Sequence, residues 1–345
     1  MVSANSRALR RVTRRSQAAS ILVLIAMKLL LIGLSSIARR RILPAAMQCG
    51  FETIEVASRT ASQNGWNTSG VARIYSDYSI ALDETPADLV YISTVNSTHA
   101  ELAEAALTRG FHVIVDKPAF LSLAETERLA ALALRQQRLL AEATVWSYHP
   151  RIGAARRVFA DAGSEPTQIV STFSFPPMPR HDFRYRRELG GGAVWDLGPY
   201  ALTPGRVFFG DGTPALAARV TQFLGDVETS FSLLGVFSKG RSLVGSFGYN
   251  TGYINRLEVA GPGMSVWMDR VFSPPADFPS ELVVRNAAGT TVVPVSPADN
   301  FKLMLMGALE DIAGGRFREP AGQMLADAKA MAALRQAVET GNGPA

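Results

Sequence analysis

A short turn near the start of the chain has the spacing of a dinucleotide-binding motif. The sequence GLSSIA (33–38) follows the apolar run 28–32, where the phosphate turn of a doubly wound sheet lies. Gly33 permits a tight turn, and Ala38 permits close packing of a helix on a strand. Ser35 replaces the usual middle glycine, so the backbone approaches a phosphate less freely, although its hydroxyl could donate to one. We predict cofactor contacts from Gly33, Ser35, Ser36 and Ile37; an ordinary strand–helix turn is the alternative.

Further polar residues stand at or just after the ends of the other apolar runs, and ligands of parallel sheets lie beyond the carboxyl ends of the strands. The predicted cofactor contacts here are Ser58, Arg59, Thr94, Asn96, His99, Asp116 and Lys117. An arginine after the second strand favours the extra phosphate of NADP. We therefore expect NADP(H) as the cofactor, with NAD(H) as an alternative. A surface arginine at a strand end would show the same spacing.

Strand and helix patterns alternate in the chain from residue 28 to residue 146. Apolar runs predict strands at 28–34, 53–59, 87–94, 111–118 and 139–146. Two helices are expected between the later strands, with capping boxes formed by Thr98 with Glu101 and by Ser122 with Glu125, and with Gly110 ending the first. This rhythm predicts an α/β fold, with a doubly wound parallel (Rossmann) sheet over residues 27–147.

The pattern changes after residue 147. Short strands separated by Gly, Pro and Asn run from 167 to 295, and helices are expected at 198–209, 299–313 and 320–340. Alternating apolar and polar residues predict an open, largely antiparallel sheet with helices on one face, in an α+β domain over 148–345. We expect this domain to bind substrate and to form oligomer contacts.

Composition excludes several classes of protein. The net charge of +5 equals the five arginines of residues 1–26, which leaves the rest of the chain neutral. A basic nucleic-acid face is therefore not expected. Cys49 is the only cysteine, so no internal disulfide forms, and the four histidines lack the spacing of a metal site.

Residues 1–26 form a basic extension with two open interpretations. The twin arginine and apolar run of TRRSQAASILVLIA resemble an export leader. The uncharged run 16–27 is too short to span a bilayer, so no membrane contact is expected. The interpretation we favour is a cytoplasmic protein in which Met27 is the true start or residues 1–26 are a disordered extension; export through a twin-arginine-like leader is the alternative.

Two separated motifs resemble the Gfo/Idh/MocA family of NAD(P)-dependent sugar oxidoreductases. The first is TVNSTHAELAEAALTRGFHVIVDKPAFLSLAE (94–125), in which Val95 replaces a proline and Asp116 replaces a glutamate of the family pattern. The second is ELGGGAVWDLGPYA (188–201), which carries the aspartate of the family at Asp196 and a tyrosine four residues later at Tyr200. The resemblance extends from Lys28 to the C-terminus.

The resemblance implies a catalytic set of Lys117, Asp196 and Tyr200 for interconverting a ketone and an alcohol on a sugar. A nearby Lys117 ammonium would lower the pKa of the Tyr200 phenol, and a cis peptide before Pro118 would aim the lysine into the cleft. The resemblance further implies a homo-oligomer, dimer or tetramer, formed through the open sheet. We also expect Arg184 and Trp195 to contact substrate.

Alternatives to these assignments stay open at the level of sequence. Lys117 could be solvated, Asp196 could cap a helix, Tyr200 could pack in the core, and Arg184 could form surface ion pairs. Segments 181–210 and 246–275 look like the nucleotide-sugar 3-ketoreductase and polysaccharide-biosynthesis branch of the family. A free sugar or cyclitol dehydrogenase and a catalytically silent nucleotide sensor are the alternatives.

Overall fold

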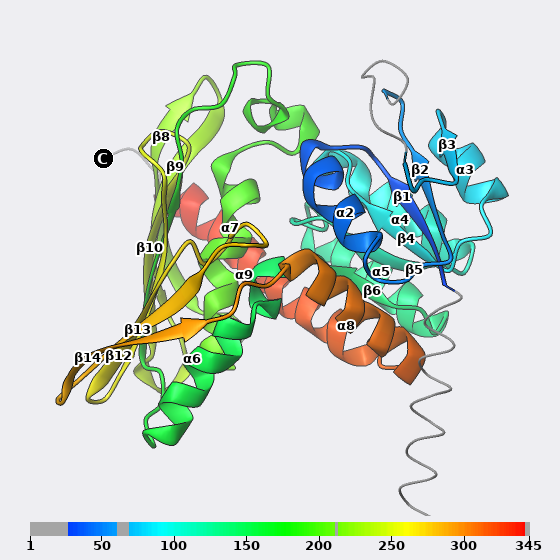
Figure 1. Cartoon of the computed structure of the whole chain (residues 1–345). Helices are drawn as coiled ribbons and strands as arrows, with labels where there is room; N and C mark the ends of the chain where they lie inside the picture. The colour runs from blue at the N-terminus through cyan, green and yellow to red at the C-terminus, as the bar shows by residue number, and fades with distance from the viewer. Residues whose placement is uncertain (1–26, 61–68, 211–212, 342–345) are drawn as a thin grey trace, which may run out of the picture.

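Six parallel strands form the first sheet, in the order β3-β2-β1-β4-β5-β6 (Figure 1). The computed structural model describes residues 27–60, 69–210 and 213–341. The strands are β1 (Lys28–Ile32), β2 (Thr53–Ala57), β3 (Arg73–Tyr75), β4 (Leu89–Ile92), β5 (His112–Val115) and β6 (Leu140–Glu142). Helices cover both faces of such a sheet, so its central strands are apolar throughout, as the fully buried β4 is. The predicted Rossmann sheet is confirmed.

The helix that follows β1 contains a π-helical segment. Helical residues begin at Ser36 and include η1 (Ala38–Ile42) and α2 (Leu43–Ala46). The N–H of Leu43 bonds the carbonyl of Ala38, five residues back. Pro44 has no N–H, and its ring would collide with the carbonyl four residues earlier in a regular helix. The wider π turn therefore accommodates the proline.

The two helices with predicted capping boxes begin differently. At the start of α5 (Leu123–Arg135), the N–H of Glu125 donates to Ser122 Oγ at 3.1 Å, as predicted. At the start of α4 (His99–Thr108), Thr98 makes no cap hydrogen bond and donates its hydroxyl proton to Val95 O. The predicted box of Thr98 with Glu101 is wrong, because a 3-10 turn, η3 (Asn96–Thr98), leads into the helix.

Eight strands form the second sheet, in the order β14-β13-β12-β11-β7-β10-β9-β8. Only the β7–β10 pair is parallel among the paired strands described, so the predicted, largely antiparallel sheet is confirmed. The strands are β7 (Gln168–Ser174), β8 (Ala215–Leu224), β9 (Val227–Val236), β10 (Ser242–Gly248), β11 (Ile254–Gly261), β12 (Met264–Asp269), β13 (Ser280–Asn286) and β14 (Gly289–Val295).

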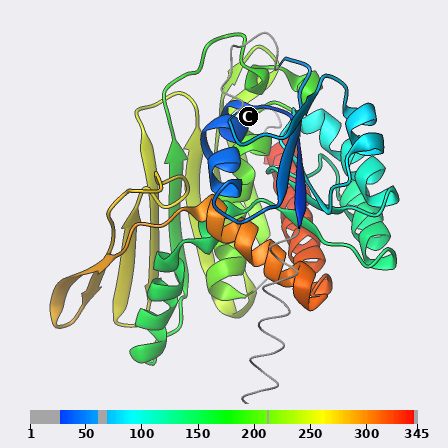
Figure 2. The same ribbon diagram turned by 45° about the vertical axis from the view of Figure 1, so that its right-hand side comes forward.

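Helices gather on one face of this second sheet, the face toward the first domain (Figure 2). They are α6 (Pro150–Asp161), α7 (Ala193–Phe209) and α9 (Arg318–Gly341). α7 begins five residues before the predicted start, so the glycine run 190–192 leads directly into it. Short 3-10 turns are η4 (Val145–Tyr148), η5 (Phe183–Tyr185), η6 (Arg187–Leu189) and η7 (Ser238–Gly240).

The last two helices tie the domains together. α8 (Asn300–Gly314) follows the second sheet in sequence but packs on the first, where Phe301, Met304 and Leu305 share a core with β1 and β4 (Figure 1). α9 contacts α7 and β8 on one side and α5 and β6 on the other. α9 therefore packs against elements of both domains.

Sequence patterns miss four elements: β3, α3 (Tyr78–Glu84), α6 and β8. β3 has three residues, and β8 is largely exposed, so neither has the apolar run that marks a buried strand. Across residues 27–60, 69–210 and 213–341, no helix has the length and apolar character needed to cross a bilayer. The predicted basic extension lies outside the described residues.

Candidate active site

A cavity of ≈ 730 Å³ runs from the turn after β1, past the ends of β4 and β5, to α7 and the second sheet. It brings together ten of the eleven predicted cofactor contacts and all three predicted catalytic residues. These are Gly33, Ser35, Ser36, Ile37, Ser58, Arg59, Thr94, Asn96, Asp116, Lys117, Asp196 and Tyr200. Arg184 also lines it. His99 and Trp195 lie elsewhere.

The turn after β1 requires glycine at its first position. Gly33 has φ +89°, and a Cβ there would lie 2.3 Å from the carbonyl oxygen of Ser93 at the end of β4. Only glycine fits this close approach between neighbouring strand ends. The first N–H groups of the helix that begins at Ser36 have no partner within the helix, so they can receive an anion at the cavity wall.

Ser35 does not have the role expected from the sequence. Its Oγ accepts the N–H of Ala38 at 3.0 Å and lies 2.7 Å from Ser93 Oγ. Ser93 donates its single proton to Asp116 Oδ2 at 2.5 Å, so Ser35 must donate to Ser93. The Ser35 proton is therefore used inside the protein, and the expected donation to a phosphate is corrected: this serine caps the helix and joins two strand ends.

Three arginines give the lining of the cavity positive charge. Arg59 follows β2 and lies over the ring of Tyr78 at 4.7 Å. Arg40 and Arg41 lie on the first helix and line the same cavity. The Arg41 guanidinium donates to Pro274 O. Sequence analysis missed Arg40 and Arg41, although three successive arginines one turn after a phosphate turn are the signal that could have found them.

His99 is a buried structural residue and lines no part of this cavity. Its Nδ1 lies 3.0 Å from Pro118 O and its Nε2 lies 3.3 Å from Thr94 O. Burial is the main reason that its pKa lies below the usual value. The predicted cofactor contact is corrected: the ring joins the end of β4 to the loop after β5. The peptide bond before Pro118 is cis, as predicted.

Asp116 reaches the cavity, but its carboxylate is occupied by protein donors. Tyr91 OH donates to Oδ1 at 2.7 Å, and Ser93 Oγ donates to Oδ2. Burial raises the pKa of Asp116 above the usual value, and the two hydroxyl hydrogen bonds oppose that rise. This acid therefore supports the strand ends that carry the neighbouring Lys117.

The two family-like motifs meet at Lys117. The ammonium donates to Asp196 Oδ1 at 2.5 Å and to the backbone carbonyl of Asp196 at 2.7 Å. Asp196 Oδ2 accepts from Arg184 Nε at 2.8 Å. Nearby, Asn96 Nδ2 donates to Gly190 O at 2.9 Å. Lys117 is thus a partly buried, paired cation and not a solvated lysine.

Asp196 is an ionised residue inside the first turn of α7, whose N-cap is Gly192. Burial would raise the pKa of Asp196, but Arg184 and Lys117 outweigh it and hold that pKa well below the usual range. In turn, Asp196 raises the pKa of Lys117 despite the opposing effect of burial. The alternative role of Asp196 as a helix cap is excluded, and Lys117 stays an ammonium.

Tyr200 lies one helical turn after Asp196 on the same face of α7. The Lys117 ammonium lies 4.8 Å from the centre of the Tyr200 ring, above its face. Burial raises the pKa of Tyr200, and the opposing effect of Lys117 is smaller. The expected fall in this pKa is therefore wrong: the phenol keeps its proton. Phe173 and Phe272 flank the ring at 5.1 Å and help to bury it.

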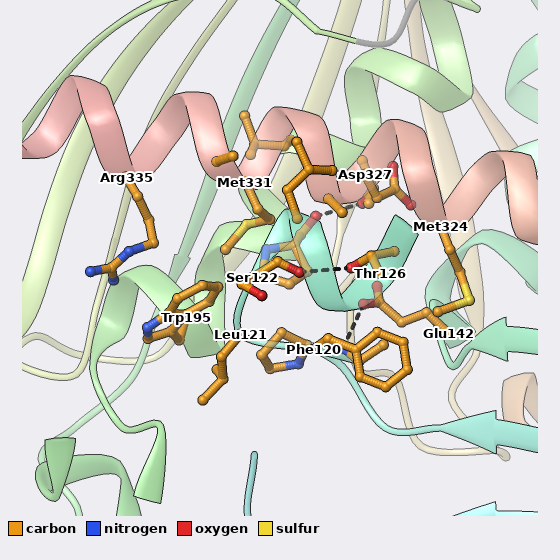
Figure 3. Close-up of a pocket in the computed structure, with 18 of the residues that line it drawn as sticks. Phe120, Leu121, Ser122, Thr126, Glu142, Trp195, Met324, Asp327, Met331 and Arg335 are labelled. Atoms are coloured by element: carbon orange, nitrogen blue, oxygen red, sulfur yellow. Dashed lines mark hydrogen bonds between the residues drawn. The ribbon is translucent and has the colours of Figure 1, made fainter. Parts of the chain in front are cut away.

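The two predicted substrate residues have different places. Arg184 is anchored in the cavity wall by Asp196 and Asp182. Adjacent residues on a helix point about 100° apart, so Trp195 faces away from Asp196. It lines a second cavity of ≈ 290 Å³, where Arg335 lies over its ring at 4.6 Å (Figure 3). The prediction that Trp195 contacts substrate has no support from this geometry.

The chemistry of the donors fits a dinucleotide in the first cavity. A tight glycine turn and the helix start that follows it suit a pyrophosphate, and three arginines line the same cavity. Elsewhere in the cavity, a cationic lysine and a neutral tyrosine lie together in a largely buried site. Such a pair can polarise a carbonyl oxygen and donate a proton to it. No group of acids, histidines or cysteines that could hold a metal lies within residues 27–60, 69–210 and 213–341.

Comparison with known proteins agrees with this arrangement. A model of the Gfo/Idh/MocA oxidoreductase family, NAD-binding Rossmann fold, matches residues 27–144. A model of the Gfo/Idh/MocA C-terminal domain matches residues 154–266. Together the two matches cover most of the chain and include both motifs.

Relatives with named activities are similar over most of the chain. The dTDP-3,4-didehydro-2,6-dideoxy-alpha-D-glucose 3-reductase of Streptomyces violaceoruber is 31% identical over 323 residues, 88% of this chain and 93% of the relative. The reductase of the same name from Actinomadura kijaniata is 31% identical over 255 residues, 72% and 76% of the two chains.

A solved structure has the same fold. It is a 3-ketoreductase from Actinomadura kijaniata in complex with NADP and TDP-benzene, with a TM-score of 0.84 and 27% identity over 91% of this chain and 98% of that chain. An aldose-aldose oxidoreductase from Caulobacter crescentus, at 22% identity and a TM-score of 0.77 over 92% and 98% of the two chains, shares the fold. The chain therefore belongs to the Gfo/Idh/MocA family of oxidoreductases, with an NAD-binding Rossmann domain.

Proposed function

We propose that this protein is an NADP(H)-dependent reductase of a keto group on a nucleotide-activated sugar. The observation that carries the proposal is the pairing of a charged Lys117 with a protonated Tyr200 in the cavity of the glycine turn. A bound reduced nicotinamide supplies the hydride to the carbonyl carbon. Lys117 polarises the carbonyl oxygen, and Tyr200 donates a proton to that oxygen.

The protonation states favour reduction as the direction of the reaction. Oxidation of an alcohol needs a base that takes its proton, whereas reduction of a ketone needs an acid. The raised pKa values of Lys117 and Tyr200 keep both groups protonated near neutral pH. Asp196, whose pKa is low and whose oxygens bind two cations, holds the lysine in place and is a poor base.

Two further observations support the cofactor and the substrate class. Arg59 follows β2 and lines the cavity where an adenosine 2′-phosphate would lie, and Arg40 and Arg41 line the same cavity. Two relatives that match most of the chain are named dTDP-sugar 3-reductases. A nucleoside diphosphate on the sugar would supply remote binding energy in addition to that of the reacting ring.

The test is a turnover assay that follows the absorbance of reduced nicotinamide. Three substrate sets are compared: TDP-linked 3-keto sugars, the same sugars without the nucleotide, and free aldoses or cyclitols. The proposal expects turnover with the first set and NADPH. Preference for the second or third set would replace it with the free-sugar dehydrogenase alternative. Cofactor binding without turnover of any set would favour the nucleotide-sensing alternative.

The assembly and the cellular location belong to the same proposal. The open face of the second sheet exposes Val170 and Leu234, with Val244 paired between them on β10. An apolar row of this kind suits a self-complementary contact between two copies, and we propose a homo-oligomer formed there. Cys49 as the only cysteine fits a reducing compartment, and we propose that the enzyme works in the cytoplasm.

A further inference from the structure

Glu142 is an acidic residue beside the loop that carries Lys117. The sequence analysis did not single it out. It is the last residue of β6 and pairs in register with Val115, the last residue of β5. The chain after β5 forms the loop 116–121 that carries Lys117. Glu142 lines the cavity shown in Figure 3 and is not among the residues that line the cofactor cavity.

The Glu142 carboxylate binds the loop directly. Oε2 accepts the N–H of Ala119 at 2.8 Å, and Oε1 accepts from Thr144 Oγ1 at 3.3 Å (Figure 3 shows the bond to the loop). Ala119 is two residues after Lys117. The carbonyl of the intervening Pro118 lies 3.0 Å from the His99 ring. The peptide group between Pro118 and Ala119 is therefore held at both its carbonyl and its N–H, by side chains from two different elements.

The hydrogen bond from the Ala119 N–H to Glu142, called the anchor below, can affect the position of the reacting groups. Lys117 lies in the cofactor cavity only because its backbone and its ammonium are both held, the ammonium by Asp196. Asp196 belongs to α7, so the free end of the lysine is fixed to the second domain. Glu142 and His99 fix its backbone end to the first domain. A shift of about 1 Å in a reacting group can lower turnover by about 100-fold.

We propose that Glu142 is a positioning residue that holds the loop carrying Lys117 through its bond to the Ala119 N–H. The inference rests on the proposed function for the role of Lys117. It assigns no contact with substrate or cofactor to Glu142.

The electrostatic surroundings of Glu142 make the anchor dependent on pH. Burial raises the pKa of Glu142 to about 7, with a further rise from Asp327 on α9. The Ala119 N–H, Thr144 and Arg206 on α7 oppose this rise. The Arg206 guanidinium is itself bound by both oxygens of Asp327, each at 2.7 Å.

Other charged or titratable side chains line the two cavities that Glu142 borders. They are Tyr148 on η4, Arg156 on α6, Glu310 and Asp311 on α8, and Glu319, Arg335 and Glu339 on α9. The net effect still leaves the Glu142 carboxyl titrating near neutral pH. As the carboxylate forms, its bond to the Ala119 N–H becomes charge-assisted, so the loop is held more firmly on the alkaline side of that transition.

The test compares the wild-type protein with Glu142→Ala and Glu142→Gln. We expect Glu142→Ala to lower kcat by about 10-fold or more while the KM values for sugar and NADPH stay nearly constant. Glu142→Gln keeps an acceptor oxygen for the Ala119 N–H, so its kcat should match that of the wild type on the acid side of pH 7. Wild-type kcat should rise by about fivefold through pH 7, as a charge-assisted bond replaces a neutral one, whereas Glu142→Gln should lack this rise.

A matched control is Thr126→Val, which removes a hydroxyl from the same cavity. The Thr126 hydroxyl donates to the carbonyl of Ser122, the N-cap of α5, and not to an atom of the loop 116–121. We expect the kcat and the pH profile of this variant to match the wild type. A reduction in kcat equal to that of Glu142→Ala would mean that any polar deletion in this cavity disturbs the fold, and it would overturn the inference.

Hydrogen exchange provides a readout that needs no substrate. Peptides covering residues 116–121 should exchange faster in Glu142→Ala than in the wild type, with Thr126→Val unchanged. Equal exchange in all three proteins would overturn the inference. If Lys117→Ala leaves turnover intact, the proposed function fails. If Lys117→Ala abolishes turnover but Glu142→Ala has wild-type kcat and wild-type pH dependence, only the role of Glu142 fails.

Discussion

Lys117 donates to Asp196 twice, once to the carboxylate and once to the backbone carbonyl of the same residue. The carbonyl of a residue in the first turn of a helix normally accepts from the residue four positions later, so here it is shared with a side chain from the other domain. This double contact fixes the ammonium against α7 one turn before Tyr200. The catalytic pair is therefore assembled by the packing of the two domains.

Replacing Asp196 by Asn should lower kcat by about 100-fold and shift the alkaline end of the kcat profile to lower pH. Asp196 is what raises the pKa of Lys117 against the effect of burial, so without it the lysine loses its proton more easily. The measurement is kcat from pH 6 to pH 10 for both proteins. An unchanged alkaline limb would mean that Lys117 does not control it.

The ion pair of Asp196 with Lys117 also makes the stability of the folded protein depend on pH. The pKa of Asp196 is depressed in the folded protein, so its stabilising effect is present above its unfolded value of 3.8 and is lost as the pH falls through the folded value.

Glu142 changes the stability in the opposite direction with pH. Its folded pKa is raised from 4.5 to about 7, so stability is lost as the pH rises through that window. The melting temperature of Glu142→Gln should therefore fall less than that of the wild type between pH 5 and pH 8.

Replacing Tyr200 by Phe should lower kcat by about 100- to 1,000-fold with little change in KM. The ring packing against Phe173 and Phe272 is kept, and only the proton donor is removed. Steady-state kinetics with a ketone substrate, together with a melting curve, would check this. A variant with wild-type kcat would exclude Tyr200 as the acid.

Arg59→Ala should raise the KM for NADPH by about 10- to 100-fold, the effect of losing a hydrogen bond to a charged group, and should leave the KM for NADH nearly unchanged. Arg73→Ala is the matched control, since Arg73 also lies over a tyrosine ring but lines no part of the cofactor cavity. Equal effects on the two cofactors would contradict a role in binding the 2′-phosphate.

Ser35→Ala should lower the free energy of unfolding by about 1 kcal/mol, because the N–H of Ala38 loses its cap. The KM for NADPH should stay close to that of the wild type, because the Ser35 proton is donated to Ser93. Chemical denaturation and cofactor titration test the two expectations separately. A large rise in KM with unchanged stability would restore the phosphate contact expected from the sequence.

Leu234→Asp should convert an oligomer into smaller species, because it places a charge in the apolar row on the open sheet. Ile80→Asp is the control, since Ile80 is also an exposed apolar residue but lies on α3, far from that sheet in the chain. Light scattering after size exclusion gives the mass of each variant. The same mass for Leu234→Asp and the wild type would rule out this face as the contact.

Local sequence determined the glycine turn and the strands of both sheets other than β3 and β8. Buried strands such as β4 are continuous apolar runs, and Gly33 is dictated by its own positive φ and by the Ser93 carbonyl beside it. These features depend on residues that are close in the chain or in neighbouring strands, so periodicity and residue type reveal them. The motifs around Lys117 and Asp196 likewise indicated the residues that line the cavity.

Tertiary structure alone decided what those residues do. The pKa of Tyr200 is raised and not lowered, because burial exceeds the effect of Lys117, and burial is a property of the packed domains. The Ser35 hydroxyl and the His99 ring bind partners from other elements, which no spacing in the sequence specifies. Glu142 became visible as an anchor only when β6 was placed beside β5, because the free energy of a charged group depends on the surroundings that folding builds.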